Sequence, residues 1–263
     1  MDKNYLYLAE KRGVTVCAET KVIDVRPLND CADGADGYVV STVPTFSRWK
    51  PKVRHITAGK VIFSASSLGS QALLFSLRDS GSLPNISVSL GKRVRTNAES
   101  ILGVRYPGSQ EDMSKGVAIG SGIYIDQHTH VEAVRYADGS NLLSSLLTTL
   151  TAGRQGASRP LYWLLAFIRL LLTRPITAIR SVLPYRFSRE TVIFLVMQAL
   201  EGHLDMRWTR PWYWPFKKTL STHGAPIPTF IPAANEFTRK AAAATGGVGM
   251  SSLSEIFFNV PMT

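Results

Sequence analysis

Two histidines and a glutamate alternate along one short stretch of the chain, at His128, His130 and Glu132. Side chains two residues apart on a β-strand point to the same face, so this stretch would bring two imidazoles and a carboxylate together. These groups are metal ligands, but a closed site needs a further donor at a compatible spacing. A metal site and a hydrogen-bonded polar face beside a cleft both fit the pattern. We expect the polar face and no bound metal.

A second candidate for chemistry is the turn at residues 64–70, Ser-Ala-Ser-Ser-Leu-Gly-Ser, between an apolar run and an expected helix. Small residues there would let backbone amide groups approach a phosphate, and the positive end of the helix dipole would favour the anion. The same composition is typical of ordinary packing between a strand and a helix. The turn alone leaves both interpretations open.

Well-defined nucleotide-binding and hydrolase patterns are missing from the sequence. It has no GxGxxG, no GxxxxGK[ST] and no serine in a GxSxG elbow, so a complete dinucleotide fingerprint, a P-loop and hydrolase chemistry have no support. The two cysteines, Cys17 and Cys31, cannot by themselves build a disulfide framework or a metal site. We expect reduced thiols, and a single Cys17–Cys31 bridge is the alternative.

The most hydrophobic segment covers residues 160–173 and contains one charged residue, Arg169. It is shorter than the roughly 20 apolar residues that span a bilayer. Arginines surround it, and Tyr162 and Trp163 lie at its start. This combination is typical of a helix that lies on an anionic membrane surface. A helix packed on the protein's own sheet would give the same pattern, so both interpretations stay open.

The charge balance is basic, with 30 Lys and Arg residues against 19 Asp and Glu residues and a net charge of +11. Such an excess fits a nucleic-acid partner, an anionic membrane or solubility alone. The tryptophan-rich segment at residues 208–218 has two interpretations. Its aromatic side chains suit the headgroup region of a membrane, and they also suit stacking on the bases of a single-stranded nucleic acid. Because the basic residues are dispersed and no nucleic-acid-binding motif is present, we expect no nucleic-acid partner.

The elements that must position these residues follow from hydrophobic periodicity, which predicts an α+β fold dominated by antiparallel strands. A length of 263 residues fits two domains, and we place them at residues 1–81 and 82–263. Strands are expected at residues 14–17, 21–26, 37–43, 61–65, 101–106, 117–126, 130–136 and 190–200. Helices are expected at residues 3–12, from the turn at 66–70 to about 81, and at 159–183, 233–245 and 252–258.

Four stretches, taken in their order and spacing, carry a resemblance to a known family. They are residues 14–16 with 21–25, residues 60–74, residues 77–85 with 90–97, and residues 258–263. On these stretches the chain resembles the glucose–methanol–choline (GMC) flavoprotein oxidoreductases, and within them the cholesterol oxidase-like branch. The resemblance implies that residues 1–81 are part of an FAD-binding domain with a β-meander. It implies that residues 82–263 form a substrate-binding domain with an antiparallel sheet and covering helices.

The resemblance also implies roles for individual residues. Val22 would contact the FAD adenine. Ala65, Ser66 and Gly69 would form the loop beside the cofactor, and Asn97 would lie near the flavin or the substrate. At Ser66 the family has glycine.

In the second domain, the strand expected at residues 190–200 would line an apolar substrate chamber. Side chains alternate across a strand, so Ile193, Leu195 and Met197 share one face. We expect this face to contact the substrate. The opposite face, which includes Phe194 and Val196, would then pack against the rest of the domain.

Two parts that the family's activity requires would lie outside these residues: a GxGxxG unit upstream of Met1, and the catalytic His and Asn beyond Thr263. The chain therefore resembles an internal fragment, inactive alone, of an FAD-dependent enzyme that oxidises a lipophilic, sterol-like secondary alcohol to a ketone by hydride transfer to flavin. The alternative function is a non-catalytic membrane-surface or lipid-binding module built on residues 160–173. Residues 1–5 contain no apolar stretch of signal-peptide length, which favours a cytoplasmic or peripheral membrane location.

Overall fold

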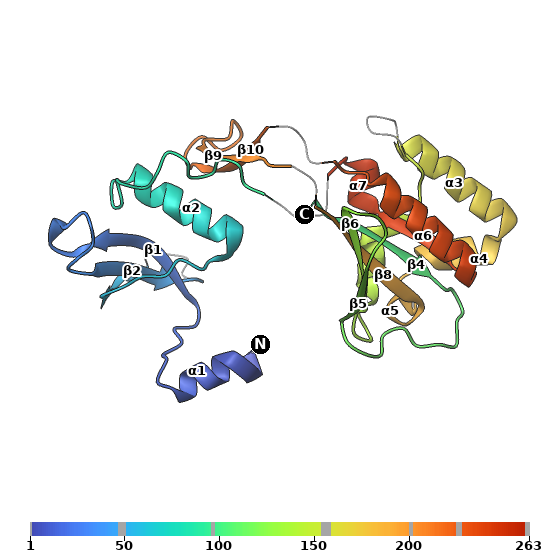
Figure 1. Cartoon of the computed structure of the whole chain (residues 1–263), viewed down its shortest axis with the longest axis horizontal. Helices are drawn as coiled ribbons and strands as arrows, with labels where there is room; N and C mark the ends of the chain where they lie inside the picture. Colours follow the sequence, from blue (N-terminus) through green and yellow to red (C-terminus); the bar gives the residue numbers. More distant parts are fainter. Residues whose placement is uncertain are drawn as a thin grey trace. The chain divides into compact units, whose positions relative to one another are not determined.

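The structure is a computed structural model that describes residues 2–46, 51–95, 98–153, 159–199, 202–224 and 228–260. The chain divides into two compact units. The first comprises Met1–Lys92 and Asp205–His223, and the second comprises Arg93–Leu204 and Gly224–Thr263. This division differs from the boundary expected after residue 81, because the segment that begins at Asp205 returns to the first unit (Figure 1).

The first unit contains a three-stranded antiparallel sheet in the order β1-β2-β3 and a two-stranded ribbon of β9 and β10. Valine, threonine and isoleucine occupy eight of the fifteen positions of β1 and β2, and such β-branched residues fit the pleated backbone of a strand. The helix α2 packs against β1 and β10. The elements are η1 (Asp2–Leu6), α1 (Tyr7–Lys11), β1 (Thr20–Pro27), η2 (Leu28–Asp30), β2 (Tyr38–Pro44), β3 (Arg54–Ala58), α2 (Ser66–Asp79), β9 (Asp205–Thr209) and β10 (Thr219–His223).

Two strands expected in the first unit are wrong. Residues 14–17 and 61–65 belong to no strand. No described strand pairs with residues 61–65, so their β-propensity finds no hydrogen-bonding neighbour among the described residues. The helix expected at residues 3–12 is present as η1 and α1, and it ends before Gly13, whose φ of +90° suits a helix terminus.

Both cysteines are free thiols, so the alternative of a Cys17–Cys31 bridge is wrong.

A close backbone contact at Gly91 holds β9 in the first unit. The N–H of Met206 donates to the carbonyl oxygen of Gly91 at 2.7 Å. A Cβ at Gly91 would lie 2.3 Å from the carbonyl oxygen of Met206, and the φ of this residue is +80°. Only glycine fits such a close approach and such a backbone. Two residues further on, Trp208 stacks on Phe75 of α2 with ring centroids 6.2 Å apart.

The second unit contains a six-stranded sheet in the order β5-β6-β8-β4-β11-β7, and all of its pairings are antiparallel. Together with the helices, it confirms the α+β class expected from the sequence. The strands are β4 (Ser100–Arg105), β5 (Ile119–Tyr124), β6 (Thr129–Val134), β7 (Leu147–Thr149), β8 (Thr191–Gln198) and β11 (Val248–Ser252). The helices are η3 (Asn141–Leu146), α3 (Arg159–Thr173), α4 (Pro175–Val182), α5 (Phe187–Glu190), α6 (Pro232–Thr245) and α7 (Leu253–Phe257).

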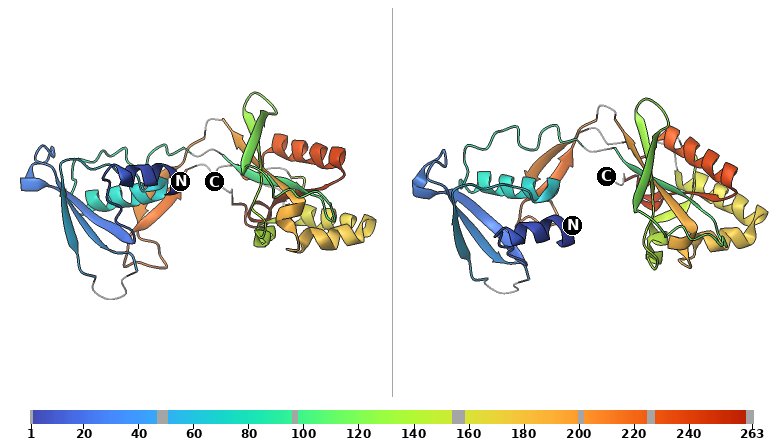
Figure 2. Two further views of the ribbon diagram at one scale, coloured as in Figure 1. Left: turned by 90° about the horizontal axis from the view of Figure 1, so that it is seen from below. Right: turned by 60° about the horizontal axis from the view of Figure 1, so that its bottom comes forward.

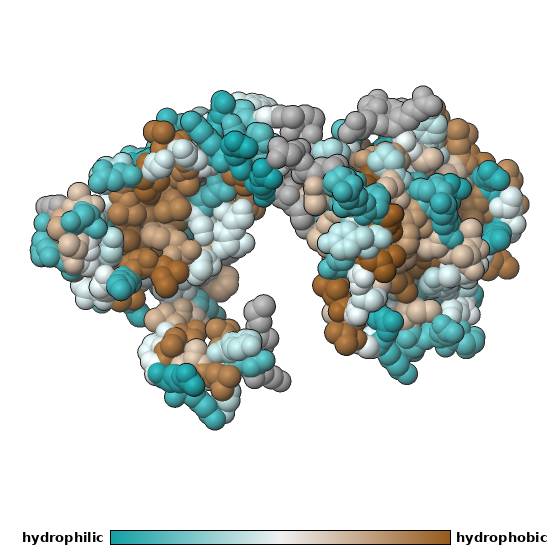
Figure 3. All heavy atoms as spheres, in the orientation of Figure 1, coloured by the Kyte–Doolittle hydropathy of each residue, from teal (hydrophilic) through white to brown (hydrophobic). Residues whose placement is uncertain are grey.

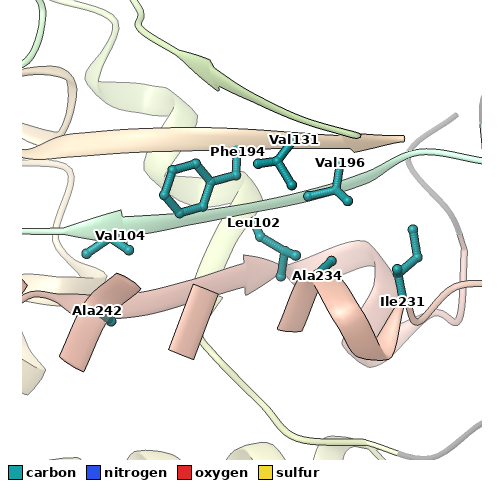
Figure 4. Close-up of a cluster of buried hydrophobic side chains, with 8 residues drawn as sticks. All are labelled: Leu102, Val104, Val131, Phe194, Val196, Ile231, Ala234 and Ala242. Carbon is teal, nitrogen blue, oxygen red and sulfur yellow. The ribbon is translucent and has the colours of Figure 1, made fainter. Parts of the chain in front are cut away.

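Apolar side chains cover both faces of this sheet because residues along β8 alternate between them. On one face, Phe194 and Val196 pack against α6, which runs alongside the sheet (Figures 2 and 4). On the other face, Ile193 packs with Phe187 of α5 and Leu147 of β7. The face expected to pack within the domain therefore does so, and the opposite face is also occupied by core residues.

The helix expected over residues 159–183 is in fact two helices, α3 and α4. Between them Arg174 has φ −143° and ψ 69°, and Pro175 is the first residue of α4. A proline disfavours the helical conformation at the preceding residue, yet its fixed φ suits the first turn of a new helix. Both helices pack against β7 at the edge of the sheet.

Candidate functional site

A cavity of about 890 Å³ opens in the first unit between the sheet, α2 and the segment that contains β9 and β10. Its walls are mostly apolar: β1 contributes Val22 and Val25, β2 contributes Val40, and α2 contributes Leu73. Figure 3 shows hydrophobic surface between β1–β2 and α2 on this side of the unit. Cavities that bind small molecules have volumes of roughly 300–1,000 Å³ and mainly apolar linings. The size and lining therefore suit a cofactor or substrate.

The cavity gathers three of the residues expected to contact the cofactor. Val22, Ala65 and Gly69 all line it, although they come from β1, the loop before α2, and α2 itself. Ser66 follows Ala65 directly as the first residue of α2. Asn97 lies outside the described residues. The fold thus brings together residues that the sequence places in separate elements.

A β-bulge lies in β1 beside the cavity. The register of the β1–β2 pair shifts between Val22 and Asp24, which leaves Ile23 without a partner across the pair. In a regular strand, neighbouring side chains point to opposite faces. A bulge changes the local direction of the strand and its side chains, and Val22 and Ile23 both line the cavity.

The N-terminus of α2 carries no side-chain cap, because Ala65 precedes it and offers no hydrogen-bonding side chain. The amide groups of a first helical turn have no partner within the helix and form the positive end of its dipole. A Cβ at Gly69 would lie 3.2 Å from the Cβ of Ala65, so glycine lets the loop approach the helix closely. Apolar walls next to an uncapped helix end suit a ligand with a flat aromatic part and a negative part.

Ser66 has a left-handed backbone, with φ +60°. For a residue with a side chain, this region costs roughly 1–2 kcal/mol relative to the right-handed helix. Local strain of this kind is concentrated at functional sites, and here it lies where the loop of the cavity enters α2. Glycine is the residue that adopts this conformation without the penalty.

We therefore expect Ser66→Gly to raise the free energy of unfolding of the first unit by about 1 kcal/mol, because it removes this penalty. Chemical denaturation followed by tryptophan fluorescence would measure the change, since Trp208 packs in this unit. The matched control is Ser67→Gly, at the next position of α2. There glycine should lower the stability by up to about 1 kcal/mol. A loss of stability in both variants would contradict strain at Ser66.

Trp208 and Lys217 also line the cavity, and sequence reasoning did not place them there. The sequence pattern assigned this aromatic segment to a membrane surface or to nucleic acid. The hydrogen bond between Met206 and Gly91 and the stacking of Trp208 on Phe75 are two of the contacts that hold it in the first unit. Neither contact has a local signal in the sequence.

The three residues expected to contact the substrate lie on β8 in the second unit. Ile193 is 3% exposed and packs in the core, while Leu195 and Met197 are half-buried. The cavity that Ile193 lines has a volume of about 20 Å³. A cavity of about 990 Å³ lies near the end of β8, where Gln198 lines it with Phe230. Substrate contact by the three residues stays a prediction.

The alternating histidines lie at the start of β6. His130 and Glu132 are within the strand, with 3.7 Å between His130 Nδ1 and Glu132 Oε1, and His128 precedes it. The part of the chain that the structure describes contains no group of three or more histidine, cysteine, aspartate or glutamate residues placed to hold a metal ion.

Comparison with known proteins gives similarity over the whole chain. A protein named cholesterol oxidase from Acinetobacter baumannii is 52% identical over 263 residues, which cover 100% of this chain and 47% of that protein. Proteins of the same name from two strains of Mycobacterium tuberculosis are 37% identical over 274 residues, which cover 99% of this chain and 45% of theirs. The chain thus spans about half the length of the curated relatives it matches. No family model matches it.

Proposed function

We propose that this chain is part of an FAD-dependent oxidoreductase that oxidises a lipophilic secondary alcohol of the sterol class to a ketone. The first unit would contribute part of the flavin-binding domain, and the second unit would form the substrate-binding domain. The observation that carries the proposal is the gathering of Val22, Ala65 and Gly69 in one cavity. Similarity to proteins named cholesterol oxidase over the whole chain supports it.

The residues of the cavity fit the adenosine end of FAD. Val22 and Val25 offer an apolar wall to a flat base, and the uncapped N-terminus of α2 offers amide groups and a positive dipole to a phosphate. Lys217 adds a positive charge to the same cavity. When bound, the flavin would supply the redox chemistry by accepting a hydride from the alcohol carbon. The part of this chain's own residues would be to bind and orient the cofactor.

Residues 61–65 give the proposal a second support. They form an apolar run with β-propensity, yet no described strand pairs with them, and Ile62 is 88% exposed. An unpaired run of this type offers backbone hydrogen-bonding groups to a further strand. In the proposed enzyme, that strand would come from the GxGxxG unit, which this chain does not contain. The acid–base residues of the reaction would likewise lie outside the chain.

The proposal is tested on the protein encoded by the complete reading frame that contains these 263 residues. We expect it to purify with bound flavin and to oxidise a sterol with formation of the ketone. Val22→Glu would place an unpaired carboxylate against the base, so we expect the affinity for FAD to fall by about a hundredfold or more. Flavin absorbance and titration of the apoprotein with FAD would measure the loss.

The matched control is Ile56→Glu, on β3 of the same sheet. Ile56 is 46% exposed and is not among the residues that line the cavity, so its substitution should leave flavin affinity within about twofold of the unmodified protein. Circular dichroism would establish that both variants are folded. A complete protein that contains no flavin would overturn the proposed function. Equal losses in both variants would overturn the role of the cavity.

A further inference from the structure

The helix α3 and the edge of the six-stranded sheet border a cavity of about 470 Å³ in the second unit. On the sheet side, Thr149 of β7, Leu150 and residues 247–249 line it, and α3 forms the opposite wall. Within the described ranges, no helix is both long enough and apolar enough to cross a bilayer, and α3 packs on β7. Cavities that bind small molecules have volumes of roughly 300–1,000 Å³. This cavity is therefore large enough for such a ligand.

Most of the cavity wall is apolar and fixed by the core of the unit. Leu170 of α3 and Val248 of β11 line the cavity and also pack with the buried cluster around Phe187. Leu150 lies close to the backbone of Gly249, because a Cβ at that glycine would be 3.0 Å from the Cβ of Leu150. A wall of this kind suits the apolar part of a ligand.

The charged residues that line the cavity are two arginines. Arg169 belongs to α3, Arg174 lies between α3 and α4, and both are exposed. Among the residues that the structure describes, neither guanidinium group has a hydrogen-bond or ion-pair partner. No acidic residue lines the cavity with them. The planar fork of an arginine matches a carboxylate, so the charge of the cavity favours an organic anion.

A third polar group belongs to Thr149, which also lines the cavity and is only 7% exposed. Its Oγ1 has no hydrogen-bond partner within the described part of the chain. The preceding residue differs, because Thr148 Oγ1 accepts from Trp163 Nε1 at 2.8 Å. A buried hydroxyl group without a partner is uncommon, since it has lost its bonds to water. A carboxylate in the cavity would give Thr149 an acceptor.

A larger cavity of about 990 Å³ adjoins this one, because Leu150, Ala166 and Arg169 line both. Its acidic residue, Glu236, already pairs with Arg239 and Lys240. The apolar part of a ligand therefore has room to continue past Leu150 and Ala166.

We propose that the cavity between α3 and β7 binds a monocarboxylate with an unbranched apolar tail. Arg169, Arg174 and the hydroxyl of Thr149 would hold the carboxylate, and the tail would lie against Leu150 and Leu170. An inorganic anion would leave the leucines uncovered, and a neutral alcohol would leave the arginines without a counter-charge. The combination of apolar wall and unpaired cations therefore selects an amphiphilic anion.

Isothermal titration calorimetry would test the proposal on the protein encoded by the complete reading frame, with ligands kept below their micelle concentrations. Decanoate should bind at least tenfold more tightly than hexanoate, because four more methylene groups leave water. Decanol has the same tail without the charge and should bind more weakly than decanoate. Inorganic phosphate has the charge without the tail and should also bind more weakly. Absence of decanoate binding, or equal affinity for decanoate and either decanol or phosphate, would overturn the proposal.

Substitution of the arginines distinguishes this cavity from any other that accepts an apolar tail. Arg169→Gln and Arg174→Gln should each weaken decanoate binding about fivefold, as expected for ion pairs that water screens. Both should leave decanol binding unchanged. The matched control is Arg180→Gln on α4, because Arg180 is exposed and does not line the cavity. It should keep the decanoate affinity within about twofold of the unmodified protein, and a loss equal to that of Arg174→Gln would contradict the placement.

Thr149→Val tests the buried hydroxyl with almost no change of shape. We expect decanoate affinity to fall about fivefold, since one hydrogen bond to the carboxylate is lost. The urea midpoint of the ligand-free protein should stay the same or rise, because the hydroxyl has no partner to lose. A lowered midpoint with unchanged decanoate affinity would mean that Thr149 has a structural role only, and would overturn its part in the site.

Discussion

Replacement of Arg105 by leucine is expected to lower the free energy of unfolding of the second unit by about 3–5 kcal/mol. Arg105 lies on β4 and is 1% exposed. Its Nη1 donates to the carbonyl oxygens of Ser181 at 3.0 Å and Leu183 at 2.8 Å, and its Nη2 donates to that of Tyr185 at 2.8 Å. One buried guanidinium therefore holds the segment that connects α4 to α5.

The size of the effect follows from what the leucine would leave behind. Glu190 is 3% exposed and pairs with Arg105, with 3.4 Å between Nη2 and Oε2. Its other oxygen accepts from the N–H of Gly108 at 3.0 Å. Without Arg105, a buried carboxylate would lose its closest cation and three carbonyl groups would lose a donor. Removing one member of a buried pair is strongly destabilising for this reason.

Urea denaturation would measure the loss for Arg105→Leu. The matched control is Arg239→Leu on α6, whose side chain is 64% exposed and pairs with Glu236 at the surface. It should change the stability by no more than about 1 kcal/mol. Arg105→Met combined with Glu190→Met should recover part of the loss, because the buried carboxylate, which would otherwise keep only Arg186 at 3.8 Å as a cation partner, is then absent. A loss below 1 kcal/mol for Arg105→Leu would contradict a structural role of this pair.

The elements with a strong local pattern were predictable from the sequence. The helices α2 and α6 and the strand β8 lie where their periodicities predicted them. The break between α3 and α4 was also predictable in principle, because Pro175 disfavours a helical backbone at Arg174. The strands expected at residues 14–17 and 61–65 were wrong, because β-propensity describes a fit to neighbouring strands, and no described strand pairs with either segment.

The candidate site was predictable only in part. The resemblance to a family pointed to Val22, Ala65 and Gly69, and the structure places them in one cavity. Trp208 and Lys217 could not be placed, because they reach the cavity only when β9 returns to the first unit. The buried pair of Arg105 and Glu190 in the second unit could not be predicted either. Both side chains are charged and carry no sign in the sequence of being buried, so tertiary contacts alone decide where they lie.

A second large effect is expected from pH. Glu255 on α7 is 1% exposed, and burial raises the pKa of its carboxyl to about 7. Ser100 donates from Oγ to Glu255 Oε1 at 2.8 Å, and Arg159 Nη1 lies 3.9 Å from Oε2. Both neighbours lower the pKa of the carboxyl, but the cost of removing its charge from water outweighs them.

The sign of the pH effect follows from the two states of Glu255. Below about pH 4.5 the carboxyl is protonated in both the folded and the unfolded chain, so it does not affect the balance. Between pH 4.5 and pH 7 the unfolded chain loses the proton while the folded chain keeps it, so stability falls as pH rises. Above pH 7 both states are ionised and the loss is complete, at about 3 kcal/mol.

Glu255→Gln should remove this dependence, because the amide keeps the shape of the side chain and cannot ionise. We expect the variant to match the unmodified chain near pH 4.5 and to be more stable by up to about 3 kcal/mol above pH 7. Urea midpoints measured across this pH range for both proteins would give the difference in their stability at each pH. The contributions of the other titrating groups are the same in both proteins and cancel in this difference. Glu236→Gln is the control, since that carboxyl is exposed and its arginine partner lowers its pKa. Parallel pH curves for Glu255→Gln and the unmodified chain would contradict the prediction. They would mean that Glu255 ionises in the folded protein as it does in the unfolded chain, and that Arg159 and Ser100 stabilise its charge enough to offset burial.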